Sequence, residues 1–230
     1  MSTRSHQLEL DLRAPRRWGG SRPGAGRKPG AVRRDPHRKR APLAARHPCH
    51  VTLKVIRGLP SLRSVRFVAE LELSWREVCD GARFRLVHYS IQDDHAHLIV
   101  EAASARDLAC GLKSILARFA HAANRTFRRS GAVLADRAHV RVLRTLREVR
   151  HAIAYCLLNA RRHAAQLRRR VRHWIVRIDP ASSGRWFAGW RGRQPRPPDP
   201  PAVAQPRGWL LAEGWVRHGR IDPSEIPGGG

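Results

Sequence analysis

Residues 84–101 read FRLVHYSIQDDHAHLIVE, two runs rich in aliphatic, β-branched and aromatic residues on either side of Asp93-Asp94. Two such runs joined by a short polar turn are typical of paired antiparallel strands. We therefore predict a β-hairpin with one strand over residues 84–92 and the other over residues 95–101.

The segments around the hairpin alternate between strand and helix patterns. Before it, residues 50–56 alternate apolar and polar side chains as a half-buried strand does, and residues 61–80 have helical spacing. After it, a capping box at Ser104 predicts a helix over 104–127, and residues 139–143 resemble a strand. A second capping box, Thr145 with Glu148, opens a helix that is expected to run to about His163.

The resulting order is β-α-β-β-α-β-α. Up to its last strand, this is the split βαβ order of ferredoxin-like folds, an α+β class with one antiparallel sheet and helices packed on one face. We expect the other face of the sheet to be open for binding. This architecture hosts RNA binders, metal carriers and enzymes, so it does not decide function by itself.

Composition divides the chain into three parts. Residues 1–46 hold 13 Lys or Arg against three acids, with many Gly and Pro, and predict a disordered basic arm. Residues 47–172 have the periodicity of a folded domain. Residues 173–230 are rich in Trp and Pro and predict a C-terminal accessory region, with a helix over about 206–217 docked on the core.

The charge balance indicates a polyanionic partner. The formal net charge is +27, and 41 of the 45 basic residues are arginines, which bind phosphate bidentately and stack on bases. Nucleic acid is therefore the leading partner class. No apolar run is long enough for a membrane span, so we expect a soluble, cytoplasmic protein without a membrane partner. The four cysteines lack the close pairs of a zinc or redox motif and are expected to be buried, reduced thiols.

Two local patterns could carry chemistry. His95 and His97 are two apart on a predicted strand, so both imidazoles project from one face and form half of a metal site. Tyr155 and Asn159 lie one turn apart on the polar side of a predicted helix. The alternatives are hydrogen-bonded surface histidines and a half-buried tyrosine at the edge of the core.

The order of these patterns resembles a known family. HAH within QDDHAHLIVEA, followed by a helix with YCLLNARRH, is similar to the HUH single-strand transposases that use one tyrosine, and more closely to the REP-associated tyrosine transposases of bacteria. The resemblance covers roughly residues 47–163. RPGAGRKP at residues 22–29 and the Trp-rich tail also resemble that group. In place of the DRYH of close relatives, this chain has Ala138 where the tyrosine would be.

The resemblance implies a site and a reaction. His95 and His97 would bind Mg²⁺ or Mn²⁺, Asn159 would be the third ligand, and Tyr155 would be the nucleophile. The product would be a 5′ phosphotyrosine intermediate with a free 3′ hydroxyl, formed on single-stranded DNA near hairpins. The resemblance also implies a nucleoid-associated bacterial protein, and it makes a homodimer one possible state.

Basic side chains on three segments are candidate DNA contacts. They are the arm residues Arg22, Arg27 and Lys28, then Arg118 and Arg125 on the helix over 104–127, and Arg161 and Arg162 after the tyrosine. Arg128, Arg129 and Arg168 to Arg170 extend the same two helical clusters. Trp186, Trp190, Trp209 and Trp215 could stack on bases or anchor the accessory region.

Three functions follow from these patterns. The leading one is a metal-dependent, tyrosine-using DNA endonuclease and strand transferase. The second is a binding protein of the same fold that no longer cleaves, which the Ala138 departure allows. The third is a metal-dependent phosphodiesterase in which water is the nucleophile.

Overall fold

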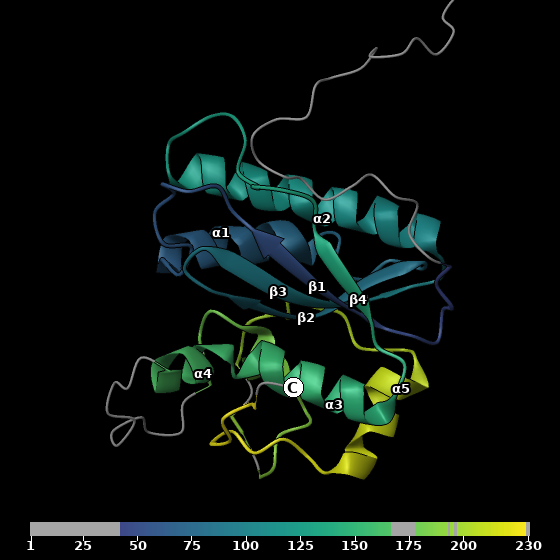
Figure 1. Ribbon diagram of the computed structural model, residues 1–230. Coiled ribbons are helices and arrows are strands. Elements are labelled where there is room, and N and C mark those ends of the chain that lie inside the picture. The colour runs from purple at the N-terminus through teal and green to yellow at the C-terminus, as the bar shows by residue number, and fades with distance from the viewer. Residues whose placement is uncertain (1–41, 167–177, 193, 196, 229–230) are drawn as a thin grey trace, which may run out of the picture. The chain divides into compact units, whose positions relative to one another are not determined.

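The computed structural model describes residues 42–166, 178–192, 194–195 and 197–228. Its four strands form one antiparallel sheet in the order β2-β3-β1-β4, the split βαβ arrangement that the sequence predicts (Figure 1). The elements, in chain order, are β1 (Cys49–Lys54), α1 (Val65–Arg76), β2 (Phe84–Ile91), β3 (His95–Ala102), α2 (Ala105–Thr126), β4 (His139–Val142), α3 (Leu146–Leu157), α4 (Asn159–Gln166), the 3-10 helix η2 (Ser183–Trp186), α5 (Trp209–Ala212) and the 3-10 helix η3 (Gly214–His218).

The predicted hairpin is confirmed. β2 and β3 pair antiparallel around the Asp93-Asp94 turn, which the backbone N–H of Gln92 closes by donating to the carbonyl of His95. The pairing shifts between Leu86 and His88, so the strand carries a β-bulge. A bulge re-aims side chains, and here Val87 and His88 both lie on the face away from α1 and α2.

Helices α1 and α2 cover one face of the sheet, as expected (Figure 1). Ser64 caps α1 by accepting from the N–H of Phe67, so that helix begins later than the predicted residue 61. Ser104 caps α2, as predicted. The indole N–H of Trp75 in α1 donates to the carbonyl of Ile115 in α2, which satisfies a buried donor between the two helices.

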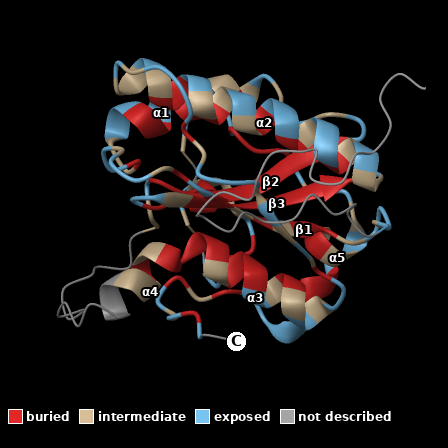
Figure 2. Cartoon of the chain, turned by 45° about the horizontal axis from the view of Figure 1, so that its top comes forward, coloured by how far each residue is buried: buried red, intermediate tan, exposed pale blue. Residues whose placement is uncertain are grey.

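The expectation that the other face is open is wrong. Val87 and Ile99 are buried there under Val149 and Ile153 of α3, together with part of the C-terminal region. Figure 1 shows α3 on the opposite side of the sheet from α2, and Figure 2 shows the strands largely as buried. The physical reason is that this face carries an apolar patch, which the apolar stripe of α3 removes from water.

The single helix predicted from Thr145 to His163 is two helices. The predicted capping box of Thr145 and Glu148 is present, but α3 ends at Leu157 and α4 begins at Asn159. The break lies at Leu158, whose backbone N–H still donates to the carbonyl of Ala154. Tyr155 and Asn159 are therefore on successive helices.

The described C-terminal residues pack on α3. Trp190 and Trp215 are buried in the same core as Ile153, which supports an anchoring role for these two tryptophans. The helix predicted over 206–217 is present as two short pieces, α5 and η3, and the backbone N–H groups before α5 donate to the buried carboxylate of Glu101.

The cysteine prediction is correct for three residues and wrong for one. None of the four forms a disulfide, and Cys49, Cys79 and Cys156 are buried. Cys110 is exposed, because it lies off the stripe of α2 that faces the sheet. Within the described residues, none of the helices combines the length and apolar character that crossing a bilayer requires.

Candidate active site

The strands place two rows of mostly polar side chains under α3, with Ile99 as the apolar member. Successive residues of a strand point to opposite faces. Val51, Leu53 and Leu98 point into the apolar core, so the residues next to them along β1 and β3 point toward α3. Strand register aligns these residues across the sheet. One row is Ser90, His97, Thr52 and His139, and the next is His88, Ile99, His50 and Arg141.

His97 is the centre of the first row. Its Nδ1 lies 3.2 Å from Nε2 of His50 and 3.3 Å from Oγ1 of Thr52. Its Nε2 is buried and has no hydrogen-bond partner among the described residues. Burial, reinforced by the neighbouring His50, lowers the pKa of His97 to about 3. The ring is therefore neutral at pH 7 and keeps a lone pair on one nitrogen.

His95 shares this face, as the two-residue spacing predicts. Its ring centroid is 4.9 Å from that of His97 and 5.7 Å from that of His163 in α4. Its Nδ1 lies 2.7 Å from a carboxylate oxygen of Asp94. A carboxylate on one ring nitrogen fixes the orientation of the imidazole and leaves Nε2 for another ligand.

Tyr155 lies against the histidines from the α3 side. Its ring centroid is 5.0 Å from that of His97 and 5.9 Å from that of His50, both in edge contacts. The guanidinium carbon of Arg162 lies 5.0 Å from the ring centroid, in cation–π contact. The structure thus brings the predicted nucleophile and the predicted histidine pair together, with a cation beside the phenol.

Asn159 is fully buried, and both polar atoms of its amide lack a partner in the described residues. Among those residues, no three His, Cys, Asp or Glu side chains are placed to hold a metal ion. A site on His95 and His97 would therefore need a ligand of another type. The orphaned Nε2 of His97 and the orphaned amide of Asn159 are consistent with the predicted ligand set, because buried polar atoms normally have partners.

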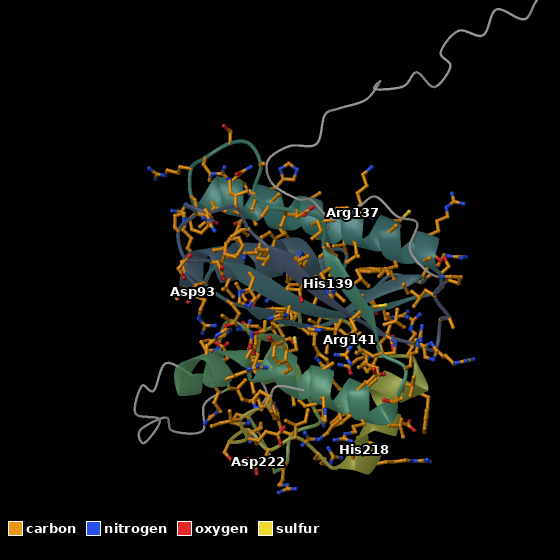
Figure 3. All side chains as sticks on the ribbon, in the orientation of Figure 1. Asp93, Arg137, His139, Arg141, His218 and Asp222 are labelled. Carbon is orange, nitrogen blue, oxygen red and sulfur yellow. The ribbon has the colours of Figure 1, made fainter. Side chains whose placement is uncertain are left out.

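A pocket of about 600 Å³ opens beside Tyr155 and runs along β4 and the start of α3. Its lining includes three arginines, Arg141, Arg147 and Arg162, and four histidines, His50, His97, His139 and His151. Glu148 is the one acid in this lining, and the capping box and Arg141 already engage its carboxylate. Figure 3 labels His139 and Arg141 along β4. The pocket therefore suits an anion next to the tyrosine.

The other predicted DNA contacts fall in three places. Arg118 and Arg125 lie on α2, across the sheet from Tyr155. Arg118 pairs with Glu77, the C-cap residue of α1, and Arg125 pairs with Glu70 of α1. Arg161 is only 7% exposed and has one unpartnered guanidinium nitrogen within the described residues. Arg22, Arg27, Lys28 and Arg168 to Arg170 lie outside the described residues.

Ala138, the residue that differs from the DRYH pattern of the resembled family, lies away from the pocket. It is partly buried against the core on the α1 and α2 side. The next residue, His139, begins β4 and lines the pocket. Position 138 therefore contributes no side chain to the pocket.

Sequence reasoning did not identify His50, Thr52, His139 and Arg141 as site residues. The signal was present in part, since the alternation over residues 50–56 put His50 and Thr52 on the polar face of a strand. What was missing was the register, which sets Thr52 between His97 and His139.

Comparison with known proteins adds little to this geometry. No family model matches the chain, and no curated protein matches it. The chain is similar to a solved structure of a REP-associated tyrosine transposase bound to a REP hairpin, at 14% identity, over 65% of this chain and 82% of that chain, with a TM-score of 0.47. We therefore base the function on the residues of the site itself.

Proposed function

We propose that this protein is a single-stranded DNA endonuclease and strand transferase of the REP-associated tyrosine transposase type. One observation carries the proposal: Tyr155 contacts the His97 ring, beside the His95 and His97 pair, in a pocket lined by basic side chains. A phenol, an imidazole pair and an anion-binding surface are the parts that phosphodiester cleavage by tyrosine requires.

The reaction is a transesterification. The Tyr155 oxygen bonds to the scissile phosphorus, the bond from phosphorus to the 3′ oxygen of the leaving strand breaks, and that oxygen takes up a proton equivalent to the one lost by the phenol. The product is a 5′ phosphotyrosine and a free 3′ hydroxyl. Because the number of phosphoester bonds is unchanged, the reverse attack by a 3′ hydroxyl can rejoin strands.

Several side chains would assist that step. A phenol is a weak nucleophile at neutral pH, so a nearby cation that stabilises negative charge on the attacking oxygen favours attack, and Arg162 is in contact with the ring. Arg141 and Arg147 would bind phosphates of the same strand and release counterions. A single strand can bend to present its phosphate to Tyr155, which a regular duplex does less readily.

A divalent ion, Mg²⁺ or Mn²⁺, would be held by His95, His97 and Asn159. Bound there, it would supply Lewis-acid stabilisation of the charge that develops on the phosphate. His50 and Thr52 would support it by fixing the His97 ring, because a donor hydrogen on Nδ1 leaves the lone pair on Nε2.

The test is incubation of the purified protein with single-stranded hairpin oligonucleotides, labelled at either end, and Mn²⁺. On a denaturing gel we expect a protein–DNA adduct with wild type and none with Tyr155→Phe or His97→Ala. Cleavage that survives in Tyr155→Phe would indicate water as the nucleophile. Binding without cleavage by wild type, over a panel of hairpins, would indicate the inactive binding protein.

A further inference from the structure

A second pocket lies on the same side of the sheet, where the C-terminal region meets β2. It has a volume of about 220 Å³ and shares no lining residue with the pocket at Tyr155. Val87 and His88 line it from the strand, and Trp186, Phe187 and Trp215 line it from the C-terminal region. We call it the β2 pocket. Ligand pockets for drug-sized molecules occupy roughly 300–1,000 Å³, so this one suits a single ring system.

The aromatic wall of the β2 pocket is held firmly. The Phe187 ring stacks on Trp215 with centroids 5.6 Å apart and contacts Trp190 edge-on at 5.1 Å. Gly189 permits this packing, because a Cβ there would lie 2.3 Å from the Phe187 ring and 2.5 Å from Trp215. Trp215 and Trp190 are themselves buried, whereas Phe187 is half-buried. A preorganised aromatic face loses little entropy when a planar ligand stacks on it.

His88 gives this apolar pocket a polar group. The bulge in β2 turns His88 toward Phe187, with ring centroids 5.2 Å apart. His88 is buried, with an exposed fraction of 7%. Its Nδ1 has no hydrogen-bond partner among the described residues. Burial lowers the pKa of His88 to about 3, so the ring is neutral and offers one donor and one acceptor.

The charge around the β2 pocket matches a nucleotide. Arg220 is an exposed lining residue whose guanidinium donates to the carbonyl of Ala188 at the rim. Arg185 stacks on Trp186, 4.0 Å from its ring centroid, but it is paired with Glu72 and does not line the pocket, so Arg220 is the arginine of the lining. The whole chain carries a net charge of +27. A planar ring with a polar edge and an attached anion fits these groups better than a purely apolar ligand does.

We propose that the β2 pocket receives one unpaired nucleobase of the DNA that is processed at Tyr155. The base stacks on Phe187, its polar edge meets His88, and its phosphate lies near Arg220. This inference rests on the proposed function, since it assumes that single-stranded DNA is the ligand. It adds a second recognition point on the same strand, away from the reacting tyrosine.

Abasic scanning of a hairpin oligonucleotide tests the pocket. Each unpaired position is replaced in turn by an abasic site, and binding to the full chain is measured by fluorescence anisotropy without metal ion. At one position we expect wild type to lose roughly 5- to 150-fold in affinity, the range of one base stacked on an aromatic ring. Phe187→Ala should lose the same amount of affinity for the intact oligonucleotide. Placing the abasic site at the sensitive position should then lower the affinity of this variant no further.

Two further variants complete the design. Trp209→Ala removes an aromatic ring that is 49% exposed and does not line the β2 pocket, so it should behave as wild type. His88→Phe keeps the ring packing while it removes both nitrogens, so it replaces Phe187→Ala if circular dichroism shows that variant to be unfolded.

Three results would overturn the proposal. The first is that no abasic position lowers the DNA affinity of wild type. The second is that the affinity losses from Phe187→Ala and from the abasic site add together, and the third is that Trp209→Ala loses as much affinity as Phe187→Ala. A Tyr155-dependent adduct together with any of them would refute the β2 pocket alone, whereas absence of both DNA binding and adduct would refute the proposed function and the pocket with it.

Discussion

The two faces of the sheet differ although the same strands build both. Toward α1 and α2, β1 and β3 present Val51, Leu53 and Leu98, all fully buried in an apolar core. Toward α3, the residues between them are His50, Thr52 and His97. The alternation of side chains along each strand is therefore enough to separate a stabilising surface from a reactive one.

Buried polar groups occur on both sides of the sheet. On the α1 and α2 side, the Tyr89 hydroxyl donates to Glu72 and the Trp75 indole donates to a backbone carbonyl, while Arg76 and Thr126 each keep a buried polar atom without a partner in the described residues. On the α3 side, His97 and Asn159 do so as well, and His97 lines the pocket beside Tyr155. Leaving such an atom unpaired costs about 1–3 kcal/mol, so a ligand that binds in this pocket and pairs with it would recover that cost.

The largest effect on stability is expected from the apolar face. Phe119→Ala removes a fully buried ring that contacts Phe67 and Trp75, and should lower the free energy of unfolding by about 3–5 kcal/mol. Urea unfolding followed by circular dichroism measures this. The variant should still form the DNA adduct at temperatures where it is folded. A loss below about 1 kcal/mol would show that this layer is not the principal core.

On the histidine face, a smaller change should affect metal binding instead of folding. His50→Phe keeps a ring in place but removes the ring nitrogen that contacts Nδ1 of His97, so we expect a roughly 10- to 100-fold loss of Mn²⁺ affinity by calorimetry. His121→Phe, an exposed histidine on α2, is the matched control and should bind as wild type. Unchanged affinity in His50→Phe would mean that Thr52 alone orients His97.

The buried histidines should make the α3 side sensitive to acid. The pKa of His88 is about 3 in the folded chain, as burial disfavours its charge, and about 6.5 when unfolded. The unfolded state therefore binds more protons below pH 6.5, and stability falls from there toward pH 3. At pH 5 this amounts to at most about 2 kcal/mol. Urea unfolding at pH 7 and pH 5 should show a smaller fall for His88→Phe than for wild type, and an equal fall would contradict this account.

The smallest effects should come from the arginines, and they should differ between faces. Arg162→Ala removes the cation over Tyr155 and should slow adduct formation by roughly 2- to 30-fold. Arg118→Ala breaks an ion pair with Glu77 and should lower the free energy of unfolding by at most about 1 kcal/mol. A larger loss of DNA affinity in Arg118→Ala than in Arg162→Ala would place the DNA on the α2 side.

The sequence predicted the features that depend on residues close together in the chain. The hairpin and the shared face of His95 and His97 depend on neighbouring residues, and the structure confirms both. The caps at Ser104 and Thr145 are equally local and are also confirmed.

Features that depend on distant partners were missed. Val87 and Ile99 are buried by α3 and the C-terminal region, which are distant from them in the sequence. The break at Leu158 interrupts a continuous helical pattern, and it separates Tyr155 from Asn159. The alignment of His97 with Thr52 and His139 depends on strand register, which no single segment encodes.

The most direct test of the two-face account uses the two tyrosines of the chain, one on each face. Tyr155 lies with the histidines, and Tyr89 is buried in the opposite core against Trp75. The protein is trapped with a hairpin oligonucleotide and Mn²⁺, digested, and the nucleotide-bearing peptide is identified by mass spectrometry. We predict a nucleotide on Tyr155 in wild type and in Tyr89→Phe, and none in Tyr155→Phe. An adduct that persists in Tyr155→Phe, or that maps to another residue, would contradict the account.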